Sequence, residues 1–308
     1  MNLEAFILGS GGMMPLPNRY LTSVLLRREG ELFLFDGGEG TQVSLRKLNL
    51  RWKKISVIFI SHTHADHVTG IPGLLMLSSQ VDRDDPLYII GPPRIAEYIE
   101  TSRRVLDMYI NYEIVIKEIT EPGIVYQGEG FHVRAFSLRH TKPCFGYAFE
   151  EDGRPGEFHP EKATALGVVR GPLWAKLQAG ETVLAVDGSE VQPDQVLGAP
   201  RSGRKFSFVT DTLAFPEIAG EVAGSDFFVC EGMFERKLEE SAREKKHMTA
   251  EQAARVAALA GVKKLALIHY SPRYTEYNLK QLLKEAQAIF PETVLSRDRA
   301  VFPIEYVD

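Results

Sequence analysis

The sequence predicts an α/β protein, built as one domain into which a separate arm is inserted. Short apolar runs rich in β-branched residues alternate with amphipathic segments through residues 3–149 and again through 206–289. Between these stretches, residues 151–204 lose the alternation and are interrupted by glycine and proline. Alternating strands and helices are typical of a layered α/β core. We therefore expect residues 1–308 to form a single domain, with residues 154–200 as an inserted flexible arm.

The first half is expected to open with a meander of strands. Glycines and prolines separate the first two apolar runs, and Asp36 ends the third run just before a glycine-rich turn into a helix. Helices then alternate with strands. The expected strands are residues 3–8, 22–26, 32–35, 55–60, 87–90, 113–119, 131–137 and 146–149, and the expected helices end at 48 or span 71–77 and 94–109.

Regular structure is expected to return after the arm. Thr249 and Gln252 have the spacing of a capping box, in which a hydroxyl and a glutamine side chain satisfy the first backbone amides of a helix. The expected elements are strands at 206–209, 227–230 and 265–268, helices from about 216, from about 249 and over 279–289, and closing strands.

Composition places the chain among ordinary globular enzymes. Its 308 residues are 44% hydrophobic and 25% charged. No apolar run reaches the roughly 18 residues of a membrane span, and no secretory signal is evident, so no membrane partner is expected. The two cysteines, Cys144 and Cys230, are too few for a disulfide scaffold. We expect a cytoplasmic protein. The net charge of −5 means that any nucleic-acid binding would depend on local basic patches.

A histidine-rich loop follows the expected strand at residues 55–60. If the strand direction persists, His62 and His64 project the same way, while Asp66 and His67 face a second point at the turn. Imidazole and carboxylate ligands without thiolates indicate a catalytic zinc-type site that keeps a position open for water. The alternative is a polar loop whose histidines only form structural hydrogen bonds.

Further candidate ligands stand at the ends of other apolar runs. His140 ends the segment at 136–140 that continues the expected strand at 131–137, Asp211 follows the strand at 206–209, and His269 follows directly after 265–268. Like His62, each of these residues comes shortly after an expected strand.

This ordered set resembles the metallo-β-lactamase superfamily, which carries a His-x-His-x-Asp-His loop followed by His, Asp and His ligands. The resemblance covers essentially the whole chain and implies a four-layer αβ/βα sandwich with two zinc ions per subunit. Asp36 resembles the carboxylate that orients a ligand histidine. The implied ligands are His62, His64 and His140 for one zinc, Asp66, His67 and His269 for the other, and Asp211 bridging both.

Within the superfamily the chain resembles the ribonuclease Z family. Residues 35–42 (Phe-Asp-Gly-Gly-Glu-Gly-Thr-Gln), 70–75 (Gly-Ile-Pro-Gly-Leu-Leu) and 271–274 (Ser-Pro-Arg-Tyr) are similar to family motifs. The resemblance implies a homodimeric endoribonuclease that removes the 3′ trailer of precursor tRNA. Attack by a metal-bound hydroxide would leave a 3′-hydroxyl on the tRNA and a 5′-phosphate on the trailer.

The family resemblance also implies roles beyond metal binding. Asp66 would accept a proton from the attacking water, and His247, oriented by Glu231, would protonate the leaving ribose oxygen. The alternative for His247 is a structural hydrogen bond at the start of a helix. Three residues would bind substrate: Ser271 and Arg273, which lie in a segment that matches a family motif, and Arg19, which is retained in a loop that otherwise departs from the family's N-terminal motif.

The arm corresponds in place to the family's flexible arm that grips tRNA, and residues 171–174 resemble its Gly-Pro stretch. Residues 154–200 carry four basic and six acidic side chains, so the electrostatic share of RNA affinity should be small there. Residues 201–205 form a better basic cluster, unless they are only solvated surface.

Two other functions remain open. A superfamily hydrolase of small phosphodiesters, or of other small esters, would use the same metal site. Deleting the arm would then spare its activity but abolish tRNA cleavage. A non-catalytic RNA- or partner-binding protein on a decayed scaffold would lack bound metal, which elemental analysis would detect.

Overall fold

The computed structural model describes residues 2–80 and 83–306. These residues form two compact units. The larger unit comprises the described residues up to Glu150 together with Lys205–Glu305, and the smaller unit comprises Glu151–Arg204 and Tyr306. The expected arm at 154–200 falls within the smaller unit. None of the helices in the described residues is both long and apolar enough to cross a membrane.

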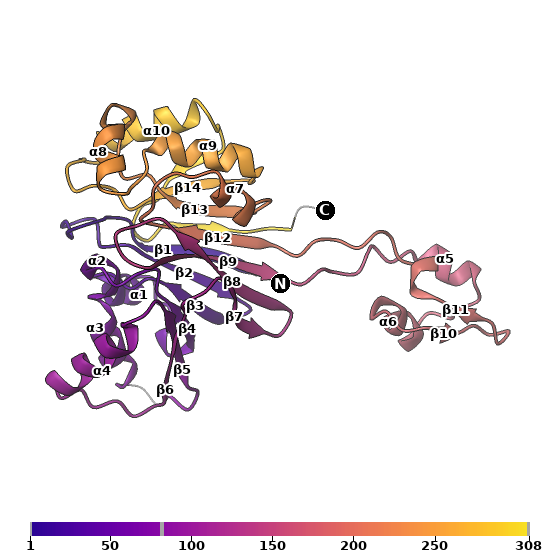
Figure 1. Cartoon of the computed structure of the whole chain (residues 1–308). Helices are drawn as coiled ribbons and strands as arrows, with labels where there is room; N and C mark the ends of the chain where they lie inside the picture. Colours follow the sequence, from indigo (N-terminus) through magenta and orange to yellow (C-terminus); the bar gives the residue numbers. More distant parts are fainter. Residues whose placement is uncertain (1, 81–82, 307–308) are drawn as a thin grey trace. The chain divides into compact units, whose positions relative to one another are not determined.

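The first sheet of the larger unit has the strand order β16-β1-β2-β3-β4-β5-β6 (Figure 1). Its opening strands pair antiparallel, as expected of a meander, and β3 to β6 pair in parallel. Parallel strands place their carboxyl ends at one edge of the sheet. The strands are β1 (Leu3–Gly9), β2 (Ser23–Arg28), β3 (Glu31–Phe35), β4 (Ile55–Phe59), β5 (Leu87–Gly91), β6 (Ile114–Glu118) and β16 (Val301–Pro303).

The second sheet has the strand order β15-β14-β13-β12-β9-β8-β7, in which β12 to β15 pair in parallel. The sequence reading missed β7, because this strand begins and ends with glycine and buries only Val125. The strands are β7 (Gly123–Gly128), β8 (Phe131–Leu138), β9 (Cys144–Glu151), β12 (Lys205–Val209), β13 (Phe227–Glu231), β14 (Leu265–Ile268) and β15 (Thr293–Leu295).

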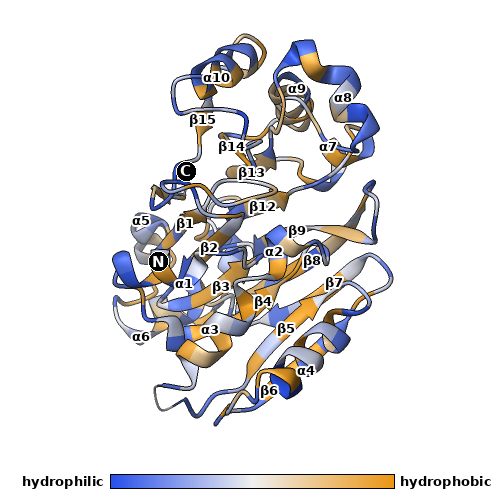
Figure 2. Cartoon of the chain, turned by 90° about the vertical axis from the view of Figure 1, so that its left-hand side faces the viewer, coloured by the Kyte–Doolittle hydropathy of each residue, from blue (hydrophilic) through white to orange (hydrophobic). Residues whose placement is uncertain are grey.

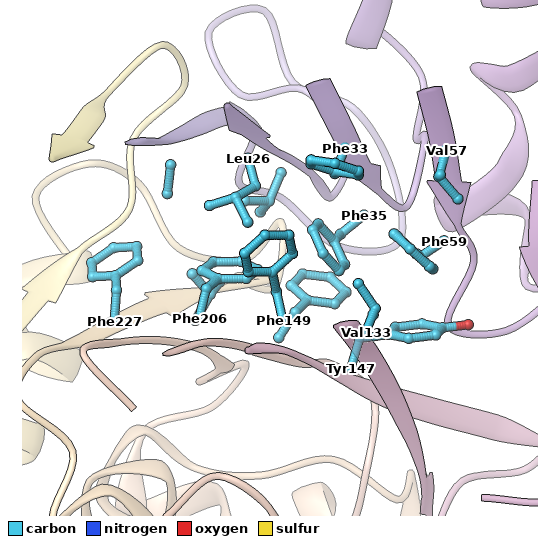
Figure 3. Packing of buried hydrophobic residues seen from close by; sticks show 14 of the residues in the cluster. Leu26, Phe33, Phe35, Val57, Phe59, Val133, Tyr147, Phe149, Phe206 and Phe227 are labelled. Atoms are coloured by element: carbon cyan, nitrogen blue, oxygen red, sulfur yellow. The ribbon is translucent and has the colours of Figure 1, made fainter. Parts of the chain in front are cut away.

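Aromatic rings fill the space between the two sheets (Figure 3). Phe35 on β3 lies 5.1 Å, centroid to centroid, from Phe206 on β12. Phe59 on β4 lies 5.2 Å from Tyr147 on β9. Tilted and edge-on ring pairs of this kind add to the stabilisation from burial alone. The apolar inner faces of the strands therefore hold the sheets face to face.

Helices cover the outer face of each sheet, and the strand layers between them are the more apolar part of the chain (Figure 2). This arrangement confirms the predicted four-layer αβ/βα sandwich. The expected helix at 94–109 is shorter, because Leu106 caps it and Asp107 turns into the left-handed region. The helices are α1 (Thr41–Lys47), α2 (Ala65–Val68), α3 (Ile71–Ser78), α4 (Ile95–Val105), α7 (Glu217–Glu221), α8 (Glu239–Glu244), α9 (Ala250–Ala260) and α10 (Leu279–Gln287), with 3-10 turns at Trp52–Lys54 and Arg236–Leu238.

The smaller unit has its own apolar cluster, in which Leu177, Val191 and Val196 are buried. The first and last residues of the stretch Glu151–Arg204 form a buried ion pair, with Arg204 Nε 2.8 Å from Glu151 Oε2. Within the basic cluster expected at 201–205, Arg204 therefore adds no exposed positive charge, because its guanidinium is buried against a carboxylate. The elements of this unit are α5 (Pro160–Ala165), α6 (Pro172–Gln178), β10 (Val183–Leu184), β11 (Glu190–Val191) and a 3-10 turn at Pro193–Gln195.

Candidate metal centre

The predicted ligands gather where β4, β8, β12 and β14 end. The loop after β4 continues into α2, and this connection carries the first four predicted ligands. His140, Asp211 and His269 follow the ends of β8, β12 and β14. Segments far apart in the sequence thus meet at one edge of the sandwich.

One group of donor atoms forms around His64. His64 Nδ1 lies 2.8 Å from His62 Nε2 and 3.2 Å from His140 Nε2. Asp211 Oδ2 lies 3.6 Å from His62 Nε2 and 3.7 Å from His140 Nε2. Three imidazoles and a carboxylate oxygen therefore converge on one point that a cation could occupy.

A second group forms around the other oxygen of Asp211. Asp211 Oδ1 lies 3.3 Å from His67 Nε2 and 3.2 Å from His269 Nε2. Asp66 Oδ2 lies 3.7 Å from His67 Nε2 and 3.8 Å from His269 Nε2. Asp211 thus lies between the two groups and presents one oxygen to each.

Hydrogen bonds fix which ring nitrogen faces each group. Thr22 Oγ1 donates to the Gly11 carbonyl, at 2.9 Å, so it accepts from His269 Nδ1 at 2.8 Å. His140 Nδ1 lies 3.0 Å from the Lys246 carbonyl, which can only accept. Both Nε2 atoms therefore keep an unprotonated lone pair, the form that binds metal.

Asp36 organises the first histidine loop from behind. Its Oδ2 lies 2.7 Å from His67 Nδ1 and accepts a 2.7 Å hydrogen bond from Ser61 Oγ. The Ser61 backbone amide donates to Oδ1, also at 2.7 Å. Ser61 Oγ in turn lies 3.0 Å from His62 Nδ1. The carboxylate predicted to orient a histidine does contact one.

The site residues fit a metal ion. His67 Nε2 and His269 Nε2 are buried and have no hydrogen-bond partner among the described residues, although each faces Asp211. Leaving buried polar atoms unpaired is costly unless another group binds them. Nitrogen and oxygen donors without thiolates suit zinc and its first-row neighbours. A divalent cation is the simplest group that would satisfy both nitrogens.

Backbone strain is concentrated at the same place. Asp36, Asp211 and His269 all have positive φ angles, of 56°, 38° and 61°. Side chains at such angles cost of order 1 kcal/mol each, and they persist mainly at functional sites. The surrounding fold therefore holds these three residues against their local preference.

Burial and neighbouring charges set the protonation of the site. Burial lowers the pKa of His62, His64 and His140, so these imidazoles are neutral near pH 7, as ligands must be. Burial raises the pKa of Asp211, but the surrounding histidines outweigh it and hold that pKa well below its usual range. Asp211 is therefore an anion between two groups of imidazoles.

His247 lies beside the metal-ligand groups. Its Nδ1 is 3.1 Å from Glu231 Oε2, and its Nε2 is 4.0 Å from Asp211 Oδ2. Glu231 is fully buried, and its Oε1 accepts a 2.6 Å hydrogen bond from the Thr212 amide. Burial lowers the pKa of His247, but Glu231 and Asp211 outweigh it and raise the pKa to about 9.

The residues predicted to bind substrate have different environments. Arg19 is buried; its guanidinium donates to the Tyr274 carbonyl and pairs with Glu276 at 2.8 Å. The expected direct substrate contact by Arg19 is therefore corrected to a structural role in holding the loop after β14. Ser271 is also buried, and its Oγ accepts from Arg273 Nε at 3.1 Å. Arg273 is exposed.

Sequence reasoning missed the residues that orient the ligands. Thr22, Ser61 and the Lys246 carbonyl contact ligand imidazoles, as described above. Thr22 and Ser61 do stand at ends of expected strands, but hydroxyl residues are common there. A backbone carbonyl has no sequence signal at all.

Comparison with known proteins agrees with this geometry. A family model described as a beta-lactamase superfamily domain matches residues 190–270, and a model of the anti-Pycsar protein Apyc1 matches residues 3–152. The sandwich and its histidine and aspartate cluster define a metallo-hydrolase of the metallo-β-lactamase fold.

More specific matches cover the whole chain. It is 70% identical to ribonuclease Z of Treponema denticola over 100% of both chains, and 42% identical to that of Borrelia hermsii over 97% of this chain and 96% of the other. The crystal structure of human tRNase Z, short form, covers 98% of this chain and 100% of its own, with a TM-score of 0.72 and 26% identity. The chain belongs to the ribonuclease Z family of endoribonucleases.

Proposed function

We propose that this chain removes the 3′ trailer of precursor tRNA, with two zinc ions per subunit. The observation that carries the proposal is the pair of donor groups joined by Asp211, with His247 held beside them by Glu231. Full-length relatives named ribonuclease Z support the choice of substrate.

The ligand assignment follows the donor groups. His62, His64 and His140 would hold one zinc and Asp66, His67 and His269 the other, with Asp211 shared between them. Bound zinc would supply an activated water and neutralise the charge on the scissile phosphate.

The remaining steps fall to side chains. Asp66 would accept the proton released by the attacking water. Its pKa is lowered, because His67 and His269 outweigh the effect of burial, so it is ionised near pH 7. His247 would donate a proton to the leaving ribose oxygen, and Glu231 would keep the ring in position. The products would be a tRNA with a 3′-hydroxyl and a trailer with a 5′-phosphate.

The assembly and location are also proposed. We infer a cytoplasmic homodimer in which the arm at 154–200 of one subunit serves the active site of the other. The family resemblance supports this inference. Because the arm is acidic, its RNA contacts would depend on backbone amides and a few cations rather than on net charge.

The deciding experiment maps cleavage of a precursor tRNA that lacks CCA and carries a 3′ trailer. Metal-analysed protein should make a single cut near the discriminator nucleotide and leave a 3′-hydroxyl. The Asp211→Ala variant should not cut. If the wild-type protein binds about two metals per chain but leaves the precursor intact, a small-ester hydrolase becomes the better assignment.

A further inference from the structure

A groove of about 720 Å³ opens directly beside His64. Its lining comes from the histidine loop, α2, α4 and Lys142. Its volume lies within the range of ligand-binding sites in proteins. His64 lines this groove and also belongs to one donor group, so the groove lies next to the candidate metal centre.

The walls of the groove combine apolar surface with hydroxyl groups. Val105 and Leu106 are 67% and 57% exposed, although both are large aliphatic residues. Tyr98 lies opposite α2, where its hydroxyl donates to the Val68 carbonyl at 3.0 Å. Apolar and aromatic surface of this kind is suited to bases of single-stranded nucleic acid, which have apolar faces and polar edges. The hydroxyl groups belong to Thr63, Thr69, Thr101 and Ser102.

The Lys142 side chain places a positive charge near the His64 end of the groove. Lys142 lines the groove, and its ammonium donates to the Thr63 carbonyl at 3.0 Å. This position is one residue from His64, so the charge lies near the phosphate that the metal centre would bind. A phosphodiester backbone leaving the centre through this groove would pass the Lys142 ammonium.

A separate cavity of about 440 Å³ opens at His247. It is lined by Leu213, Ala214, α8 residues and Gln252. Among the described residues it shares none with the groove beside His64. The groove is lined by α2 and α4, whose buried residues pack on the first sheet, whereas His247 contacts Glu231 at the end of β13 in the second sheet. Pockets therefore open next to two different residues of the candidate site, one at His64 and one at His247.

The proposed reaction determines on which side of the metal centre each part of the RNA lies. The leaving oxygen is the 3′-oxygen of the mature tRNA, and His247 is the residue proposed to protonate it. The last nucleotide of the tRNA must therefore lie on the His247 side. The trailer keeps the scissile phosphate and therefore extends away from the His247 side. We propose that the groove between α2 and α4 binds the first nucleotides of the 3′ trailer, an assignment that rests on the proposed function.

The test compares two precursors of one tRNA, with trailers of one and about six nucleotides. Wild-type protein should bind the longer one more tightly. Leu106→Glu places a carboxylate in the groove and should raise KM for the long trailer about tenfold, because the new charge repels the RNA backbone and removes an apolar contact with a base. KM for the one-nucleotide trailer should change less than twofold. Lys142→Ala should raise KM for the long trailer in the same direction.

A matched control comes from the same end of α4. Tyr109 is 78% exposed and does not line the groove in the described part of the chain. Tyr109→Glu adds the same charge nearby, so both trailers should keep wild-type KM values. Both glutamate variants should hydrolyse a small aryl phosphodiester normally, which shows that the metal centre is intact.

Cross-linking tests directly on which side of the metal centre the trailer lies. A 4-thiouridine at the second trailer position should cross-link to a peptide containing α2 or α4. A cross-link from that position to α8, or equal KM values for both trailers in wild-type protein, would overturn the groove assignment while leaving the proposed function standing. Failure to cut either precursor would instead refute the proposed function, and the groove assignment with it.

Discussion

Replacing Gly12 by alanine would push a methyl group against a proposed metal ligand. A Cβ atom at this position would lie 2.4 Å from His269 Nε2 and 2.6 Å from His269 Cε1. Ordinary contacts between such atoms begin near 3.5 Å, so the ring or the Gly12 backbone must move by about 1 Å.

The ring has little freedom to move away. His269 is fully buried, its Nδ1 is held 2.8 Å from Thr22 Oγ1, and its backbone already has a positive φ. The displaced atom is the nitrogen that faces Asp211 Oδ1 at 3.2 Å. Misplacing a catalytic group by about 1 Å can cost roughly a hundredfold in rate, and we expect a loss of that order in kcat/KM.

The assay measures precursor cleavage, metal content and thermal unfolding of Gly12→Ala beside Gly220→Ala. Gly220 lies in α7, and a Cβ there meets nothing within 4 Å in the described part of the chain. The control should keep full activity and gain up to about 1 kcal/mol of stability. We expect Gly12→Ala to lose metal and activity together. Wild-type metal content with activity within twofold would refute the reasoning.

Three further outcomes are expected. His247→Ala should lose roughly 10²- to 10⁴-fold in RNA cleavage yet keep its metal, and should lose far less with an aryl leaving group that needs no proton; metal loss would contradict the assignment. Because His247 donates only when protonated and its pKa is raised to about 9, wild-type kcat should hold through neutral pH and fall as pH rises through about 9. A pH profile of the variant should lack that fall. Glu151→Ala removes the carboxylate that accepts hydrogen bonds from the buried Arg204 guanidinium, so it should lower the free energy of unfolding by about 3–5 kcal/mol and expose residues 151–204 to limited proteolysis; unchanged proteolysis would count against a stabilising role of this ion pair.

Much of the fold was predictable because its signals are local. The strands at 55–60, 206–209 and 265–268 are short apolar runs that lie on the inside of a sandwich, and the structure places strands there. The helix at Thr249 forms with the predicted capping box, in which the Thr249 hydroxyl accepts from the Gln252 amide. The edge strand β7 was missed because an exposed edge strand has no continuous apolar run.

The candidate site was also only partly predictable from the sequence. The residue types and the order of the ligands were readable from the sequence, because the ligands follow four strands, β4, β8, β12 and β14, and each of these strands has its own apolar pattern. The role of Arg19 was not readable, because its partners Tyr274 and Glu276 lie more than 250 residues away along the chain. Only the folded chain brings such partners together.

By itself the sequence determined an α/β sandwich and an ordered set of imidazole and carboxylate ligands at strand ends. The tertiary structure decided how those ligands divide into two groups, that one oxygen of Asp211 faces each group, and which nitrogen of each ring is presented. It also decided that Arg204 is buried and that a groove adjoins His64. These features depend on distances between segments far apart in the chain, and local sequence patterns do not specify such distances.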